Sequence, residues 1–187
     1  MDAVIQGKDG NDYRIRPIRP EDAGSLMRGY DALSPQAKWF RMLHAVPHLT
    51  PEMAQDYCNP DPDDEICLVI EGQGDLAGEI LGGARISGVG PGKAGEFSVS
   101  VRPEARALGL ARRALIGVID IARDQGCASV WGSVARRNDS MRRLAERLGF
   151  TLRIDPEDRT LLLAELPLRQ EKGAPVTGAP HAVGGLR

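Results

Sequence analysis

Apolar and polar residues alternate along several short stretches of this chain, with the two-residue period of a half-buried β-strand. The clearest case is the stretch 92–103. One face of that strand carries Phe97, Val99 and Val101, and the other carries Glu96, Ser98 and Ser100. Comparable patterns predict further strands over 12–18, 65–72, 76–88, 128–134 and 159–166.

Apolar residues at three- and four-residue spacing, bounded by Ser-Pro, Thr-Pro or Gly, predict helices elsewhere. They fall at 20–33, 34–43, 50–58, 111–125 and 138–150. The strongest helix starts at Ala111 and ends before Gly126. The core-facing residues expected on it are Ala111, Ala114, Leu115, Val118, Ile119 and Ala122. The helix at 138–150 is expected to bury Met141, Leu144, Ala145 and Leu148.

This order of elements predicts one domain over residues 1–166, of the α/β class with a mixed α+β sheet. The strands at 65–72 and 76–88 meet across a glycine-rich turn and are expected to be antiparallel neighbours. One strand–helix–strand unit, from Phe97 to Val134, is expected to be parallel and right-handed. Residues 167–187 are rich in Gly, Pro and Ala, which predicts a disordered tail.

The composition narrows the classes of function. Lys and Arg number 24 and Asp and Glu 26, and the resulting net charge of −2 disfavours a general nucleic-acid binder. Cys58, Cys67 and Cys127 show no CxxC spacing, and His44 and His48 have no third ligand, so neither disulfides nor a metal site is predicted. With no secretory leader and no bilayer-spanning apolar run, we expect a cytoplasmic protein without membrane or nucleic-acid partners.

Positive charge gathers around one glycine where the strand at 92–103 leads into the helix from Ala111. Arg106 and Arg112 flank Gly109 there. A helix start presents unpaired N–H groups and the positive end of the dipole, and a glycine lets an anionic group approach the main chain. The residues alone allow two interpretations, a pyrophosphate cradle or an arginine-rich surface helix after a glycine turn. Neither the P-loop spacing nor the dinucleotide GxGxxG spacing is present.

The segment 101–111 resembles the acyl-CoA motif [RQ]-x-x-G-x-[GA] of the GNAT superfamily of N-acetyltransferases, which follows a strand ending V-x-P. The matching positions are Arg106, Gly109 and Ala111. A second motif of that family, an asparagine followed by a helix ending in Leu-Gly-Phe, matches Asn138 and 148–150. The resemblance covers about residues 13–166 and is closest to the acetyltransferase domain of bacterial protein-lysine acetyltransferases. It implies the GNAT fold, with helices on both faces of the sheet.

The resemblance also implies acetyl-CoA as cosubstrate, no metal, and acetyl transfer to a primary amine. Val99 and Val101 would offer main-chain hydrogen bonds to the acetyl and pantetheine groups, and Asn138 would contact the pantetheine arm. The pyrophosphate would be held by the main chain of Arg106, Ala107, Leu108, Gly109, Leu110, Ala111 and Arg112. A protein lysine is the expected acceptor, with a small amine such as a polyamine, amino acid or antibiotic as the alternative. A non-catalytic acyl-CoA sensor is the rival from another class, and a homodimer stays open.

Two departures from the family pattern affect these expectations. Many relatives carry a glycine beside the motif arginine, where this chain has Ala107, and the alanine is expected to tighten the loop. A tyrosine that reprotonates the CoA thiolate often lies seven residues after the motif asparagine. That position is Ala145 here, so no tyrosine acid is expected there.

Amine acetylation needs a neutral amine, and a lysine of pKa near 10.4 is neutral in only about one molecule in a few thousand at pH 7. A carboxylate beside the attacking nitrogen can take the proton directly or through water. Glu96 lies on the strand expected to line the thioester and matches the glutamate proposed as general base in protein-acetylating relatives. The alternative is a solvent-facing carboxylate in a surface pair, and Glu71 and Glu79 are secondary candidates. We expect direct attack in a ternary complex, because no cysteine is placed convincingly for an acyl-enzyme.

Overall fold

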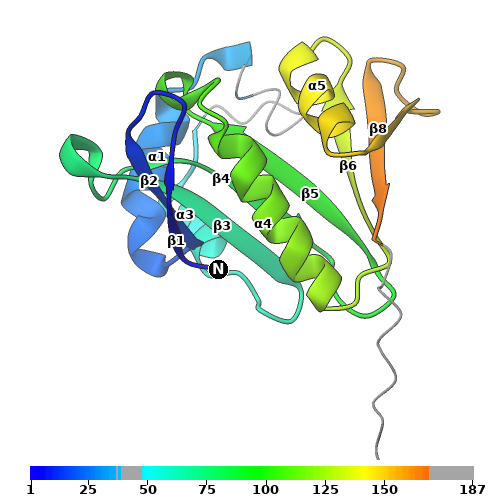
Figure 1. Ribbon diagram of the computed structural model, residues 1–187, viewed down its shortest axis with the longest axis horizontal. Helices are drawn as coiled ribbons and strands as arrows, with labels where there is room; N and C mark the ends of the chain where they lie inside the picture. Colours follow the sequence, from blue (N-terminus) through cyan, green and yellow to red (C-terminus); the bar gives the residue numbers. More distant parts are fainter. Residues whose placement is uncertain (37, 39–47, 169–187) are drawn as a thin grey trace, which may run out of the picture.

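The computed structural model describes residues 1–36, 38 and 48–168. An eight-stranded sheet runs through the molecule in the order β1-β2-β3-β4-β5-β6-β8-β7 (Figure 1). The strands are β1 (Ala3–Gln6), β2 (Asp12–Pro17), β3 (Glu65–Gly72), β4 (Ile80–Ser87), β5 (Ala94–Val101), β6 (Ser129–Ala135), β7 (Thr151–Ile154) and β8 (Leu161–Pro167). The helices are α1 (Ala23–Asp31), α3 (Pro51–Cys58), α4 (Leu110–Asp124) and α5 (Asp139–Arg147). Every neighbouring pair of these described strands is antiparallel except β5–β6.

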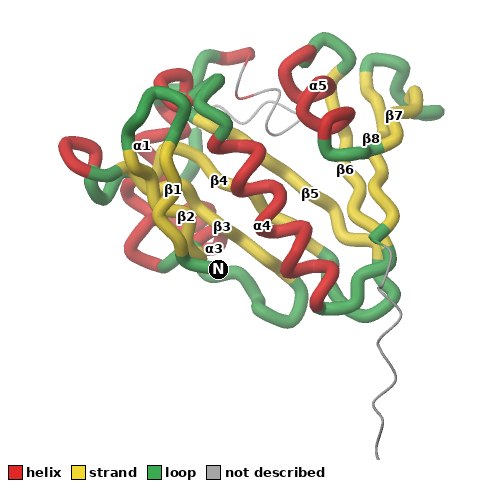
Figure 2. The backbone as a smooth tube through the Cα atoms, in the orientation of Figure 1, coloured by secondary structure: helices red, strands yellow, loops and turns green. Residues whose placement is uncertain are grey.

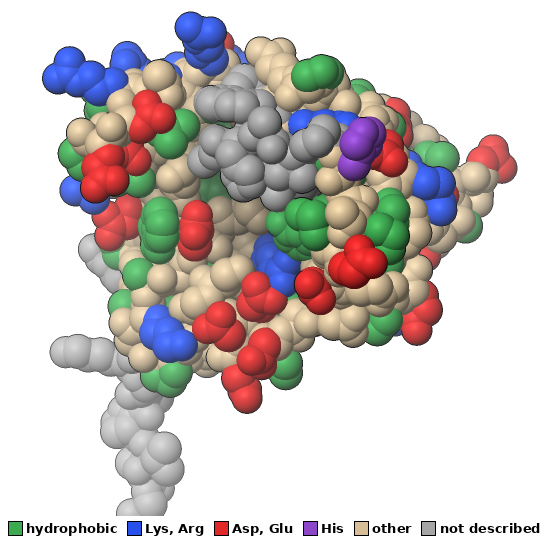
Figure 3. Space-filling model, turned by 180° about the vertical axis from the view of Figure 1, so that it is seen from behind, with side chains coloured by type: hydrophobic (Ala, Val, Ile, Leu, Met, Phe, Trp, Pro, Cys, Tyr) green, Lys and Arg blue, Asp and Glu red, His purple; other side chains and the backbone are tan. Residues whose placement is uncertain are grey.

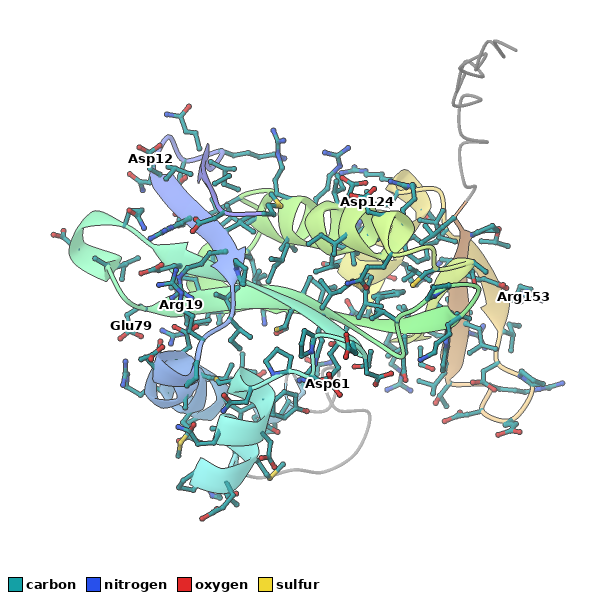
Figure 4. The ribbon with its side chains drawn as sticks, turned by 90° about the horizontal axis from the view of Figure 1, so that it is seen from below. Asp12, Arg19, Asp61, Glu79, Asp124 and Arg153 are labelled. Atoms are coloured by element: carbon teal, nitrogen blue, oxygen red, sulfur yellow. The ribbon has the colours of Figure 1, made fainter. Side chains whose placement is uncertain are left out.

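Helices cover both faces of the sheet, as the family resemblance implies. α4 lies across one face while α1 and α3 lie on the other, which is clearest in the view from below (Figure 4). The α4 face encloses the larger core, to which the helix contributes the buried side chains of Leu110, Ala114, Leu115, Val118, Ile119 and Ala122. A smaller core between α1 and α3 contains Ala23, Tyr30, Leu49, Ala54 and Cys58. The mixed architecture and the parallel β5–α4–β6 unit are therefore confirmed.

The two ends of the sheet differ from the sequence prediction. β1 and β7 were not predicted, because each has only four residues and β7 is mostly exposed.

The expected helix at 34–43 falls largely on residues outside the described chain, and so does most of the expected tail. The expected domain boundary at 166 falls inside β8, and Leu168 beyond it is buried in the larger core.

A buried ion cluster ties β2 to β3 and to the entry of α1. The Arg16 guanidinium forms a two-pronged contact with Asp22, with both N–O distances 2.8 Å. Its Nε donates to Glu71 at 2.6 Å. Glu71, a secondary candidate for the general base, is therefore held in a structural ion pair.

Glu79 fixes α1 against β4 and the end of β5. It accepts hydrogen bonds from Arg28 at 2.7 Å, from Arg102 at 3.0 Å and from the Ser25 hydroxyl at 3.2 Å. The hydrogen bond from Arg28 contributes most to holding the pKa of the Glu79 carboxyl below its ordinary value. A carboxylate that is harder to protonate is a poorer base, so these contacts favour a structural role for Glu79.

Replacing Glu79 by glutamine is expected to lower the free energy of unfolding by about 1 kcal/mol at neutral pH, because hydrogen bonds to a charged group are the stronger ones. A pKa lowered in the folded state stabilises above the unfolded-state pKa, and this contribution is lost as the pH falls through the folded-state value. Urea unfolding from neutral to acidic pH should therefore show the variant and wild type converging at low pH. A difference that stays constant would argue against the ion pairs as its cause.

Candidate active site

Strands β5 and β6 pair at their starts and then separate. Their partners are Ala94 with Ser129, Gly95 with Val130 and Glu96 with Trp131, and the described strands pair no further with each other. β5 continues along β4 to Val101, and β6 continues along β8 to Ala135. Figure 2 shows the two strands spreading apart toward their C-terminal ends. The unpaired edges leave N–H and C=O groups that can hydrogen-bond an extended ligand as another strand would.

Helix α4 begins at the same end of the sheet and has a free N-terminus. Its N-cap residue Gly109 adopts φ 84°, and no side chain caps the helix. In contrast, Thr50 caps α3 and Asn138 caps α5 through a side-chain oxygen. The first N–H groups of α4 therefore stay available to an anion, which the helix dipole also favours.

Positive side chains surround this helix start. Arg106 and Arg112 are exposed, and neither forms an ion pair with any carboxylate of the described residues. The loop between them is anchored from below, because Leu110 is buried and Leu108 packs against the larger core. These two leucine side chains therefore fix the loop to the core.

Lys8, which the sequence analysis did not identify, also lies at the cradle. Its N–H donates to the carbonyl of Leu108 at 3.2 Å, and its Cε is 3.9 Å from the position that a Cβ on Gly109 would occupy. Lys8 belongs to the turn between β1 and β2, far from the motif in sequence. No local pattern could have indicated it, because β1 itself was not predicted.

Ala107 adopts φ 61°, the left-handed conformation that favours glycine. Among the described residues that are not glycine, it alone has a positive φ. The loop therefore keeps a glycine-like backbone at the position where many relatives carry glycine. The alanine therefore strains the loop, because its Cβ is disfavoured in this conformation.

Ala107→Gly is expected to stabilise the protein by about 1 kcal/mol, because glycine removes the clash of Cβ in the left-handed region. Ala77→Gly is the matched control, since Ala77 is exposed and has φ −58°. That change should destabilise slightly through added unfolded-state entropy. The two free energies of unfolding should have opposite signs relative to wild type, and a loss of stability in both variants would contradict strain at Ala107.

The other expected cofactor contacts lie along the opening. Val99 and Val101 are on the part of β5 beyond its last pairing with β6, and their side chains pack against the larger core. The Oδ1 atom of Asn138 accepts the N–H of Met141 at 3.1 Å. The asparagine oxygen is thus used as a helix cap, and its Nδ2 group is left as the donor for a ligand.

Glu96 is the last residue of β5 that pairs with β6, so it lies where the opening begins. Its side chain is exposed and projects to the side of the sheet opposite Phe97, which is the α1–α3 side. No ion pair involves Glu96 within the described chain, which disfavours the alternative of a surface pair. The position suits a base that meets an acceptor on one side of the sheet.

A pocket of about 70 Å³ lies on this α1–α3 side. Its lining includes Ser98 and Ser100 from β5, Arg85 from β4 and Tyr57 from α3. Figure 3 shows this face of the molecule, with a hollow near its centre. Cys67 of β3 is only partly buried and also lines the pocket.

Known proteins resemble this chain along most of its length. The profile of the acetyltransferase (GNAT) family matches residues 33–150. Acetyltransferase PA5475 of Pseudomonas aeruginosa is 27% identical over 162 residues, which cover 86% of each chain. The matched segment contains β5, α4 and α5, the elements that form the candidate site.

Solved structures share the fold. The GNAT domain of PAT from S. lividans has a TM-score of 0.80 at 22% identity, covering 89% of this chain and 97% of that one. yncA from Salmonella typhimurium, solved with its cofactor acetyl-CoA, has a TM-score of 0.64 at 23% identity, covering 87% of this chain and 97% of that one.

No helix in the described part of this chain is long and apolar enough to cross a membrane.

Proposed function

This chain belongs to the GNAT family of acetyltransferases, which perform acetyl-CoA-dependent acyl transfer, and we propose that its acceptor is a primary amine, in the first place a protein lysine. One observation carries the proposal: β5 and β6 separate beyond Glu96 and open toward the end of the sheet where α4 presents an uncapped N-terminus. The preference for a protein lysine rests on the sequence resemblance to protein-lysine acetyltransferases. A small amine is the alternative, supported by the small size of the pocket that begins at Ser98, the next residue after Glu96 on the same side of β5.

In this proposal the N-terminus of α4 holds the diphosphate of acetyl-CoA, the cosubstrate that supplies the activated acetyl group. Main-chain N–H groups from Ala107 to Arg112 would face the diphosphate, and Arg106, Arg112 and Lys8 would add charge. The N–H of Arg106 itself already donates to the Pro103 carbonyl at 3.2 Å. The fit is supported by the left-handed Gly109, where a Cβ would project toward Lys8 and narrow the approach to the main chain. The open edge of β5 at Val99 and Val101 would hydrogen-bond the pantetheine arm.

Glu96 would accept a proton from the acceptor amine, directly or through one water, so that the neutral nitrogen can attack the thioester carbon. The negative charge that develops on the thioester oxygen would be met by a main-chain N–H of β5. Glu71 and Glu79 are weaker candidates for the base, because arginines already engage both.

Direct attack predicts that Cys67→Ser keeps most of the wild-type turnover, although Cys67 lines the pocket. A covalent acyl-enzyme on that thiol would instead require the sulfur, and the variant would lose the reaction. The measurement is CoA release with a thiol reagent, alongside mass spectrometry of the protein after exposure to acetyl-CoA alone. Cys127→Ser, at a fully buried thiol, is the control for loss through misfolding.

The acceptor is tested by incubating the protein with labelled acetyl-CoA and a cell lysate, then separating labelled protein from labelled small molecules. Label on protein lysines supports the proposed acceptor, and label confined to small molecules supports the alternative. Acetyl-CoA binding without any labelled product would favour the non-catalytic sensor. Lysate with the Glu96→Gln variant is the control for acetylation that proceeds without the enzyme.

A further inference from the structure

We propose that the acceptor carries a carboxylate close to its amine, and that Arg85 binds this carboxylate in the pocket beside Glu96. The inference rests on the proposed function, because it names the substrate class of the same site. It makes Arg85 a specificity-determining residue. The carboxylate could belong to an amino acid or to an acidic residue beside a lysine in a protein.

Sheet register places Arg85 close to the proposed base. Arg85 of β4 lies opposite Ser98 of β5, and Ser87 lies opposite Glu96. Arg85 and Glu96 are therefore diagonal neighbours on the same side of the sheet, at a separation of about 7–8 Å between backbones. The acceptor would therefore span from Glu96 on β5 to the Arg85 guanidinium, which is paired with Glu65 of β3.

The guanidinium of Arg85 is held in place before any ligand binds. It is paired with Glu65 and lies over the ring of Tyr57, with Cζ 5.1 Å from the ring centroid. The Arg85 side chain is only 14% exposed. Arginine held in this way suits a carboxylate, because its planar donors match the two oxygens.

One donor of this arginine is unused. The Nε atom of Arg85 is buried and meets no acceptor among the described residues. A buried donor without a partner is unusual in a folded protein and costs free energy. A carboxylate in the pocket would supply the missing acceptor once a shift of the Arg85 side chain uncovers this nitrogen, and this links the unused donor to the class of ligand.

Arg102 lines the same pocket but is already committed to the fold. Its Nη2 donates to Glu79 and to the Ser25 carbonyl, both at 3.0 Å. Its Nε, like that of Arg85, is buried and meets no acceptor among the described residues, but it is packed against α1, where a Cβ on Gly29 would be only 2.6 Å away. Arg85 therefore remains the arginine available to a ligand.

The pocket leaves room beside Arg85 for a short acceptor. Gly82 and Gly83 contribute no side chains to the lining, while Leu26, Leu33 and Leu49 form apolar walls. Such a lining favours an acceptor with a short apolar body between or beside its charged groups. A polycation would instead place a second positive charge next to Arg85.

Matched acceptors test the inference on the full chain. One arm uses L-amino acids against their carboxamides, and the other uses peptides with a lysine flanked by Asp against the same peptides with Asn. We expect kcat/KM to favour the carboxylate form by about 10–100-fold in one arm, the usual range for a hydrogen bond to a charged group. The arm that shows the preference identifies the source of the carboxylate. Equal rates for both forms in both arms would overturn the inference.

Variants decide whether Arg85 is responsible. Arg85→Gln should bring the ratio of kcat/KM for carboxylate and amide acceptors close to 1. The same ratio is expected for the double variant Arg85→Gln with Glu65→Gln, in which Glu65 no longer leaves an unpaired carboxylate. Arg123→Gln removes an arginine from a more exposed ion pair, with Asp120 on the surface of α4, and should keep the wild-type preference. If the double variant regains the preference, Arg85 serves only to hold Glu65 and the inference is wrong.

Binding separates this inference from the proposed function. Thermal unfolding with each acceptor pair, in the presence of CoA, reports recognition without turnover. A carboxylate-dependent shift that Arg85→Gln abolishes supports the inference even if no acceptor is acetylated, a result that would defeat only the proposed function. Turnover of amides and carboxylates alike, with no difference in thermal shift, would defeat the inference and leave the proposed function standing.

Discussion

Glu96→Gln is expected to lower the rate of acetyl transfer by about 10²–10⁴-fold, the usual contribution of general base catalysis. Glutamine keeps the size of the side chain and much of its hydrogen bonding but cannot take a proton. The affinity for acetyl-CoA should hardly change, because the α4 N-terminus and the main chain of β5 are untouched. Steady-state kinetics and calorimetric titration with acetyl-CoA measure the two effects separately.

The pH profile of this variant distinguishes a base from a structural glutamate. In the wild type, the acidic limb of the kcat/KM profile should include the ionisation of the base, and this limb should be missing from the profile of the variant. At high pH more of the acceptor amine is already neutral, so the variant should regain part of its activity. A structural role predicts a lower melting temperature and a rate loss that does not shrink as the pH rises.

Glu21→Gln is the control for the loss of one carboxylate, because Glu21 is exposed in the turn before α1. This variant should behave as the wild type in both rate and pH profile. A well-folded Glu96→Gln protein with full activity would remove Glu96 from the mechanism. An ordered water held by the backbone, or Glu79 after release from its arginines, would then have to accept the proton.

Gly109→Val is expected to abolish most of the stabilisation that acetyl-CoA confers. A ligand at a hundredfold excess over its dissociation constant stabilises the folded protein by about 2.7 kcal/mol. A branched side chain on Gly109 would project beside Lys8 into the approach to the first N–H groups of α4, so the diphosphate could not reach them. Thermal unfolding with and without acetyl-CoA measures the shift directly.

Strain must be separated from lost binding, because Gly109 has φ 84° and a β-branched residue is disfavoured there. Gly92→Val provides the control: Gly92 has φ 73°, and a Cβ there would meet no atom within 4 Å. Both variants should melt lower than wild type, but Gly92→Val should keep the full acetyl-CoA shift. A preserved shift in Gly109→Val would place the diphosphate site elsewhere.

Much of the site could be predicted from the sequence because it is built from contiguous segments. The strand alternation at 92–103, the glycine before Ala111 and the apolar face of the following helix all depend on neighbours within a few residues. Local backbone preferences and hydrophobic periodicity determine such features. The parallel β5–α4–β6 unit followed as well, because a strand, a long helix and a second buried strand have few ways to pack.

The tertiary structure decided the features that depend on distant partners. β1 and β7 have four residues each, and pairing rather than local pattern makes them strands. Lys8 reaches Gly109, and Arg85 lies beside Glu96, only because strands remote in sequence align in a particular register. The unpaired Nε of Arg85 is likewise a property of burial. Register and burial arise from contacts across the whole sheet, so the chemistry on the acceptor side could be recognised only in the folded chain.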